Sequence, residues 1–215
     1  MPVTLIAYCG AGVAAAGEHS SSIEGTLASF PGLKIILPST PYDAKGLLKA
    51  AIRDDNPVAY LIHKLLVFNG ITSDIPSEEY TIPLGEADIK REGKDVTVVA
   101  TGAMVKQALT AGDKLQEKGI SIEVVDPRTL VPLDRDSIIK SVEKTGRLVI
   151  MTEETNTVNF ATMVSALVAE EAFDLLNAPI KRINAPATPV PMSPPLEKFW
   201  IPNEGDLVKA IIEMI

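Results

Sequence analysis

The sequence predicts an α/β protein made of two successive units, each built around a parallel sheet. Two observations lead to this prediction. Short apolar, β-branched runs alternate with longer helical stretches, which is the pattern of parallel α/β units. The composition, with 46% hydrophobic and 22% charged residues, is that of a globular chain, and 215 residues are enough for two small domains.

The first unit is predicted to span residues 1–67. Val3 to Tyr8 is its first strand, and a loop rich in Gly and Ala follows from Cys9 to Gly17. Ser21 and Glu24 have the spacing of a capping box, so a helix is predicted to start there.

A second strand and helix of this unit follow. The run LKIIL, from Leu33 to Leu37, lacks two-residue alternation and therefore predicts a strand buried on both faces. Thr40 supplies a cap residue, and Pro41 stands at the first helical position. The inner stripe of this helix is predicted to contain Leu47, Leu48, Ala51 and Ile52. Residues 58–62 then return as a strand.

Residues 68–94 are predicted to be a linker, because Gly, Pro and charged residues are frequent there. Residues 95–215 form the second unit. Its predicted strands are 96–101, 121–125, 147–152 and 181–183, and its predicted helices are 104–118, 134–145, 159–176 and 206–214. Seven of the 16 prolines fall between Pro179 and Pro202, so this stretch is predicted to be an extended strap.

The first unit poses a physical problem, since it has only about three predicted strands. A parallel sheet of that size leaves apolar edges and faces uncovered. We therefore expect either that a partner chain covers them, or that this polypeptide corresponds to the later part of a longer domain.

Composition excludes several classes of function. Twenty-eight acidic and 20 basic residues give a net charge of −8, which repels nucleic acid and anionic lipid, so neither is an expected partner. A single cysteine, Cys9, cannot form an internal disulfide, and the expected compartment is the reducing cytoplasm. No apolar run approaches the roughly 18 residues of a membrane span, and no secretory signal is recognised.

Few residues point to chemistry by themselves. The Gly10-x-Gly12 loop lacks the full phosphate-binding pattern, so a plain turn is favoured. His19 lies at the expected carboxyl edge of the sheet, where it is either a capping or packing residue or a catalytic one. His63 is assigned to structure or solvent, and Cys9 to a small buried hydrophobe.

Acidic residues give two further candidates. Asp126, Glu153 and Glu154 each follow a predicted strand, where α/β folds place their sites, but helix capping or a solvated loop is favoured. Asp54 and Asn56, with carbonyls of the preceding helical turn, offer oxygen ligands for a cation. A polar helix stop is an equally good interpretation of that pair.

Several long stretches carry a resemblance. PSTPYDAKGLL from Pro38, YTIPLGEADIK from Tyr80 and DPRTLVPLD from Asp126 closely resemble the beta subunit of thiamine-diphosphate-dependent 2-oxo acid dehydrogenases, of the pyruvate and acetoin type. The resemblance covers the chain from about residue 1 to its end. It implies a partial pyrimidine-binding α/β unit followed by a transketolase C-terminal-type α/β domain. It also implies that the front of the pyrimidine-binding domain is missing, together with the glutamate that contacts the cofactor.

The resemblance implies roles for four residues. His19, within Glu18-His19-Ser20-Ser21, matches the active-site histidine implicated in acyl transfer to the lipoyl group. Ala51 through its carbonyl, Asp54 and Asn56 match residues around a structural potassium ion. One departure is the run Thr157 to Ala161, which stands where the family has a glycine-rich turn.

The implied function is that of a beta subunit, or a fragment of one, acting on a 2-oxo substrate through thiamine diphosphate. It would share this cofactor with an alpha subunit and pass the acyl group to a lipoyl-acyltransferase. The implied partners are that alpha subunit and the lipoyl-acyltransferase core, within an oligomer, with the core docking around Pro194 to Pro202 and the final helix. The missing glutamate leaves an alternative, a noncatalytic assembly module derived from the same subunit.

Overall fold

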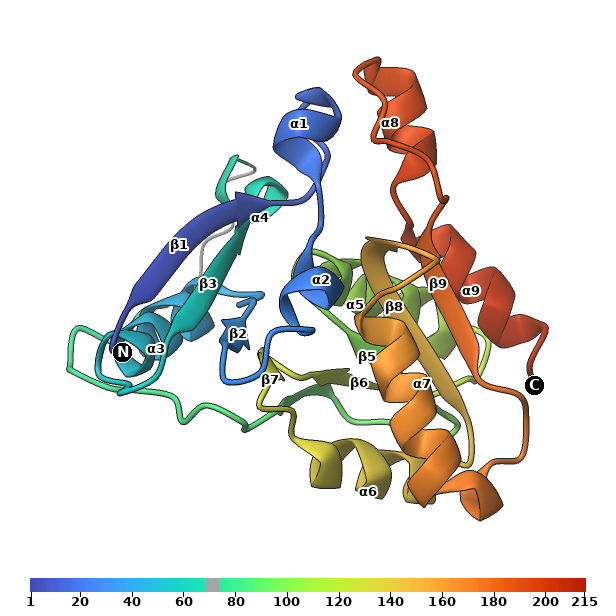
Figure 1. Ribbon diagram of the computed structural model, residues 1–215. Helices are drawn as coiled ribbons and strands as arrows, with labels where there is room; N and C mark the ends of the chain where they lie inside the picture. Colours follow the sequence, from blue (N-terminus) through green and yellow to red (C-terminus); the bar gives the residue numbers. More distant parts are fainter. Residues whose placement is uncertain (69–73) are drawn as a thin grey trace.

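The computed structural model describes residues 1–68 and 74–215 and confirms a mixed α/β architecture with parallel sheets (Figure 1). In chain order the elements are β1 (Thr4–Cys9), α1 (Ala16–Ser20), α2 (Glu24–Leu27), β2 (Lys34–Ile36), α3 (Pro41–Ile52), β3 (Val58–His63), α4 (Lys64–Phe68), β4 (Asp88–Arg91), β5 (Val96–Ala100), α5 (Met104–Gln116), β6 (Ile122–Asp126), β7 (Thr129–Val131), α6 (Arg135–Thr145), β8 (Leu148–Thr155), α7 (Phe160–Glu171), a 3-10 helix (Phe173–Leu175), β9 (Lys181–Ala185), α8 (Pro194–Trp200) and α9 (Glu204–Ile212).

The first sheet has the order β1-β3-β2-β7. Its first three strands are parallel, whereas β7 pairs antiparallel with β2 and comes from the second predicted unit. Ile35 and Ile36 of β2 are both fully buried, which confirms the prediction of a strand covered on both faces. The two units are thus joined by a shared sheet as well as by the chain between them.

Two local predictions for the first unit were wrong. The capping box of Ser21 and Glu24 does not form: the Ser21 hydroxyl donates to the carbonyl of Gly17 at 2.7 Å, and Glu24 turns inward as the first residue of α2. Ile52, the last residue of α3, is 64% exposed rather than part of the inner stripe. The cap by Thr40 is confirmed, since its side chain accepts from the amide of Asp43 at 3.1 Å.

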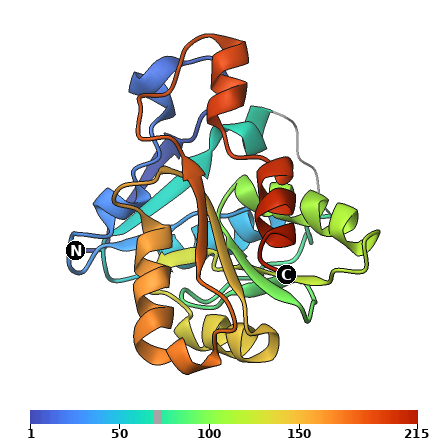
Figure 2. The same cartoon turned by 90° about the vertical axis from the view of Figure 1, so that its right-hand side faces the viewer.

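The second sheet, β4-β6-β5-β8-β9, is covered on both faces. Val99 and Val125 pack in the core with α6 and α7, while Val98 and Val124 pack with α5 and α9 on the opposite face. Figure 2 shows these helices as layers on either side of the sheet. Alternate residues of each strand face opposite layers, so strands buried on both sides are uniformly apolar.

The segments predicted as linker and strap contain regular structure. β4 lies within the predicted linker 68–94, of which residues 69–73 lie outside the described part of the chain. The strap predicted from Pro179 to Pro202 includes β9 and the helix α8. Proline is tolerated at the first positions of a helix, so Pro194 and Pro195 start α8 rather than prevent it.

β1 forms an edge of the first sheet and is bare on both faces. Leu5 and Ile6, which are neighbours and therefore point to opposite faces, are 58% and 52% exposed. Val3 and Tyr8 are exposed as well. Within residues 1–68 and 74–215, no helix has both the length and the apolar character needed to cross a membrane.

Candidate functional site

His19 lies on a segment that leaves the carboxyl end of β1 and returns through α1 to α2. We call residues 10–25 the histidine segment. Its helix α1 projects from the sheets beside α8, as both views of the molecule show (Figures 1 and 2). His19 itself is exposed, and no side chain or backbone group of the described residues is hydrogen-bonded to its ring. The ring is therefore free to meet a molecule from outside this chain.

The backbone at the start of the histidine segment is strained. Gly10 and Gly12 have φ of 84° and 103°, and Ala14 and Ala16 have φ of 54° each. For alanine this left-handed conformation costs on the order of 1 kcal/mol or more, and persists only where the surroundings impose it. A Cβ on Gly10 would lie 2.3 Å from Nε2 of His63, so only glycine fits there.

Three glutamates of the second unit hold the histidine segment by its backbone amides. Glu197 of α8 accepts from Gly12 and Ala14, each at 2.8 Å, through separate carboxylate oxygens. Glu153 of β8 accepts from Ala11 at 2.6 Å. Amides two residues apart that converge on one anion form a cradle of the kind that binds phosphate. The Gly10-x-Gly12 loop thus forms an anion cradle rather than a plain turn, but the anion it holds is a side chain of the same protein.

Glu153 also joins the histidine segment to β3. Its second oxygen lies 2.9 Å from Nε2 of His63, and both side chains are buried. The amide of Leu65 donates to Nδ1 of His63 at 3.3 Å, so Nδ1 is an acceptor and Nε2 carries the proton that Glu153 accepts. His63 is confirmed as a structural residue.

Glu154, the next residue of β8, faces the other way. One of its oxygens accepts from Gly25 at 2.7 Å and the other from Phe160 at 2.8 Å, at the first turns of α2 and α7. A Cβ on Gly25 would lie 2.8 Å from Cα of Asn159, so this contact also requires glycine. Burial raises the pKa of Glu154 above its ordinary value, and the two amides oppose that shift.

Glu24 and Cys9 are buried next to each other, and Glu24 also lies near Glu154. Burial, followed by the negative charge of Glu154, raises the pKa of Glu24 to about 8, so this carboxyl is protonated at neutral pH. Burial also raises the pKa of the Cys9 thiol, whose residue is 1% exposed. Cys9 is therefore an unreactive buried side chain, as the sequence predicts.

The interpretation of Asp126, Glu153 and Glu154 as solvated loop residues was wrong, whereas helix capping is confirmed for Glu154, which accepts from first-turn amides of α2 and α7. All three are buried, and each is bound by groups of the protein. Asp126 accepts from the hydroxyl of Ser39 at 2.5 Å, and burial raises its pKa to about 6. It belongs to a second ionic contact between the units, which also contains Asp43, Asp88, Lys90 and Arg128.

The residues proposed for potassium lie together at the end of α3, but both carboxylate oxygens of Asp54 and the carbonyl of Ala51 already have partners. Asp54 pairs with the ammonium of Lys34 through one oxygen and accepts from the amide and side chain of Asn56 through the other. The carbonyl of Ala51 accepts from the Thr4 hydroxyl at 3.1 Å. As arranged, this set fits the Lys34 ammonium, and a potassium ion would require Lys34 to move.

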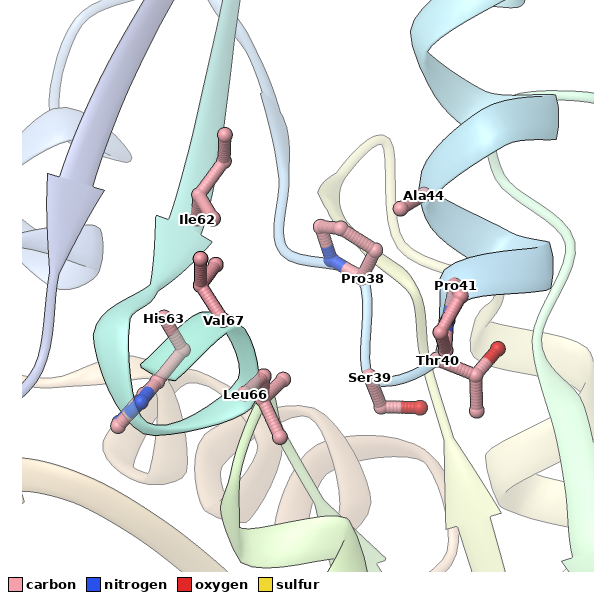
Figure 3. Close-up of a pocket in the computed structure, with 9 residues that line it drawn as sticks. All are labelled: Pro38, Ser39, Thr40, Pro41, Ala44, Ile62, His63, Leu66 and Val67. Atoms are coloured by element: carbon pink, nitrogen blue, oxygen red, sulfur yellow. The ribbon is translucent and has the colours of Figure 1, made fainter. Parts of the chain in front are cut away.

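The clearest cavity near the first unit is apolar and separate from His19 (Figure 3). It has a volume of about 230 Å³ and lies between the ends of β2 and β3. Its walls are Pro38, Ser39, Thr40, Pro41, Ala44, Ile62, His63, Leu66 and Val67. The Ser39 hydroxyl is already bonded to Asp126, so the cavity offers a mainly apolar surface.

The buried glutamates near the histidine segment are not available to thiamine diphosphate. Glu153, Glu154 and Glu197 have both carboxylate oxygens bonded within the chain. Glu24 has one oxygen without a partner among the described residues, but the side chain is enclosed, with 4% exposed. These four buried carboxylates therefore serve the protein rather than a ligand, and they do not fit the role of a carboxylate that contacts the cofactor.

The two α/β units, together with the contacts that Glu153, Glu154 and Glu197 make between them, define a two-domain protein of the transketolase class. The family profile of the transketolase C-terminal domain matches residues 85–207, and that of the transketolase pyrimidine-binding domain matches residues 1–69. The chain belongs to this family, which confirms the resemblance seen in the sequence.

Its similar relatives are beta subunits. The chain is 50% identical over all its 215 residues to the acetoin:2,6-dichlorophenolindophenol oxidoreductase subunit beta of Bacillus subtilis (strain 168), covering 62% of that protein. It is 47% identical over 208 residues to the pyruvate dehydrogenase E1 component subunit beta of the same strain, which is 97% of this chain and 63% of the relative. The chain thus spans less than two thirds of the length of these relatives.

A solved structure shares the fold. A chain described as split gene transketolase, inactive beta4 tetramer, aligns with a TM-score of 0.82 at 22% identity, over 98% of this chain and 66% of that one.

The sequence pointed to only part of this arrangement. Glu153 and Glu154 were singled out by their position after a strand, whereas Glu197 was missed as a partner of the histidine segment, and the burial of Glu24 within that segment was not predicted. A usable signal was the pair of acids that directly follows the apolar run LVIMT, because acids within a buried strand need partners.

Proposed function

We propose that this chain acts as the beta component of a thiamine-diphosphate-dependent 2-oxo acid dehydrogenase of the acetoin and pyruvate type. The observation that carries the proposal is the 50% identity to the acetoin oxidoreductase subunit beta along the entire chain. In such an assembly, the family's cofactor would be supplied and held mainly outside this chain. An alpha subunit and an oligomeric arrangement are part of the proposal.

His19 is the residue of this chain that we assign to the reaction. Its exposure on the projecting helix α1 leaves the imidazole accessible to a group bound by another subunit. Imidazole is suited to moving a proton near neutral pH, as transfer of the acyl unit to a lipoyl disulfide requires, because one sulfur accepts the acyl group while the other is reduced and leaves as a thiol. We propose that His19 takes part in that transfer to a lipoyl-acyltransferase, whose core we place near α8 and α9.

The exposed apolar side chains of β1 support the proposal that a partner polypeptide covers this strand. Two adjacent apolar side chains, Leu5 and Ile6, are exposed on opposite faces of an edge strand that pairs with β3 on one side only among the described residues. Such an edge is a template for association with another polypeptide. We assign this surface to a partner polypeptide of the dehydrogenase.

The decisive experiment is coexpression with a cognate alpha chain, followed by isolation of the complex and measurement of cofactor-dependent turnover of pyruvate and acetoin. Turnover that requires both chains supports the proposal, and the absence of both complex and turnover rejects it. His19→Ala is expected to impair lipoyl acylation more than folding. Equal losses in acylation and stability would assign His19 to structure.

A second candidate is a noncatalytic assembly module. It is favoured by the observation that the buried glutamates Glu153, Glu154 and Glu197 are engaged within the chain through both carboxylate oxygens. A stable complex with the alpha chain that binds the acyltransferase core but has no turnover would support the module over the enzyme.

A further inference from the structure

We infer that Glu153, Glu154 and Glu197 are positioning residues, which hold the histidine segment and thereby set the place of His19. The inference rests on the proposed function for the role of His19. The three glutamates do not touch a substrate. They act through backbone amides of another part of the chain.

The histidine segment depends on these carboxylates because it has little regular structure of its own. α1 contains only five residues, and two alanines have positive φ, Ala14 before the helix and Ala16 as its first residue. The amides of Ala11, Gly12 and Ala14 have carboxylates as acceptors in place of the carbonyls of a helix or sheet. A hydrogen bond to an ionised acceptor is roughly twice as strong as a neutral one, so these contacts can impose the strained conformation.

The three glutamates bind the histidine segment both before and after His19 in the sequence. Glu197 and Glu153 bind the segment at residues 11–14, before the histidine, and Glu154 binds it at Gly25, after the histidine. The three acids come from β8, a central strand of the second sheet, and from α8, whose Trp200 also packs with Ala11 of the histidine segment. The second unit therefore fixes the two ends of a loop that belongs to the first.

A carboxylate is required at each of the three positions, because both of its oxygens accept a hydrogen bond. Glu197 accepts from two amides, and so does Glu154, while Glu153 accepts from Ala11 and from Nε2 of His63. A glutamine has nearly the same shape but only one acceptor oxygen, and its NH₂ group would face a donor. Glu→Gln therefore removes one contact at each position while preserving volume.

A buried cation accompanies the acids. Lys64 of α4 is 6% exposed, and burial lowers its pKa, whereas the negative charges of Glu153 and Glu197 oppose that shift. Its charge partly offsets that of the two carboxylates in this enclosed region. A nearby cation of this kind lowers the cost of burying two carboxylates whose oxygens all act as acceptors.

The first experiment measures amide hydrogen exchange in the complete chain. In Glu197→Gln, the amides of Gly12 and Ala14 are expected to exchange roughly ten-fold faster, because one charge-assisted hydrogen bond is lost. In Glu154→Gln, the same acceleration is expected at Gly25 and Phe160. Core amides of β5 are expected to keep their protection in both variants. Glu170→Gln, at an exposed position of α7, is the matched control and should change none of these rates.

The second experiment measures lipoyl acylation in the complex with a cognate alpha chain. Glu197→Gln is expected to lower kcat for acylation by roughly ten-fold to a hundred-fold, as misplacement of a reacting group does, while KM for the 2-oxo substrate stays unchanged. A variant that merely lost stability would lower the active fraction, and titration of active sites corrects for that fraction.

Each outcome decides the inference. Unchanged exchange at Gly12 and Ala14, or faster exchange spread equally over the core, would overturn it. Faster local exchange together with wild-type acylation would also overturn it, because His19 would then not need to be held. If the wild-type complex has no turnover, the proposed function fails, and the exchange rates alone decide whether the glutamates hold the segment.

Discussion

Nε2 of His63 lies 2.9 Å from an oxygen of Glu153, and this buried pair ties the end of β3 to β8. The two residues belong to different sheets, and Glu153 also binds the amide of Ala11. A single carboxylate thus joins the carboxyl ends of β1 and β3, two neighbouring strands of the first sheet, to the second sheet.

Replacing His63 with alanine should be strongly destabilising. The change leaves one oxygen of a buried carboxylate without its donor, so we expect a loss of about 3 kcal/mol in the free energy of unfolding. Denaturant unfolding of His63→Ala, Glu153→Gln and the double variant measures the coupling of the pair, which we expect to be about 1 to 3 kcal/mol. Additive losses in the two single variants would show that the pair does not interact energetically.

Replacing Glu24 with glutamine tests the protonated carboxyl. Burial and the charge of Glu154 raise the pKa of Glu24 from its ordinary 4.5 to about 8. Between these values the unfolded chain releases a proton that the folded chain keeps, so the stability of the wild type falls as pH rises and the loss is complete above pH 8. The slope is at most about 1.4 kcal/mol per pH unit.

Glu24→Gln cannot ionise, so its free energy of unfolding should lack this contribution. Urea unfolding of both proteins from pH 5 to about pH 9 is the measurement, with Glu170→Gln as an exposed control. We expect the variant to gain stability relative to the wild type up to about pH 8 and no further. A difference that is constant across the series would mean that Glu24 is ionised in the folded protein.

Local sequence predicted the elements of the fold but not the contacts of the histidine segment. The cap by Thr40 depends on Asp43, three residues away, and the closure of α6 depends on Gly146 with φ of 67°, so both could be read locally. Glu197, by contrast, binds an amide 185 positions earlier in the chain. Its neighbours in the sequence give no sign of that partner.

The burial of Glu24 is a second feature that local sequence could not predict. The spacing of Ser21 and Glu24 is that of a capping box, and the local rule therefore favours an exposed acid at a helix start. Contacts with β1 and β8 instead place the side chain beside Cys9 and Glu154, where burial overrides the local preference. Candidate residues after strands were recognisable, whereas the direction in which each side chain points was set by packing between distant elements.

Replacing Lys34 with methionine tests the proposed potassium site. The hydrogen bond from Lys34 lowers the pKa of Asp54 to about 2, so the ammonium competes with any cation for this carboxylate. We expect the midpoint of thermal unfolding to rise more in potassium than in sodium chloride of equal strength, and the rise to be larger in Lys34→Met than in the wild type. Lys94→Met is the control, on a lysine that makes no ion pair within the described residues.

Two results would count against this assignment. No difference between the two salts in either protein would remove the ion site from Ala51, Asp54 and Asn56. An equal difference in both proteins would show that Lys34 and the ion do not compete.

Charged substitutions on β1 test whether this strand is a contact surface. Leu5 and Ile6 are 58% and 52% exposed on opposite faces of an edge strand, and burying them removes apolar area from water. We expect the isolated chain to associate as its concentration rises, and the double variant Leu5→Lys, Ile6→Lys to remain monomeric in light scattering. Val158→Lys, at a position 74% exposed in the second unit, is the matched control and should associate like the wild type. Because the replaced side chains are largely exposed, unfolding free energy should change by less than about 1 kcal/mol. A wild-type chain that stays monomeric at every concentration, and forms no complex with an alpha chain, would show that β1 is stable in water without a partner.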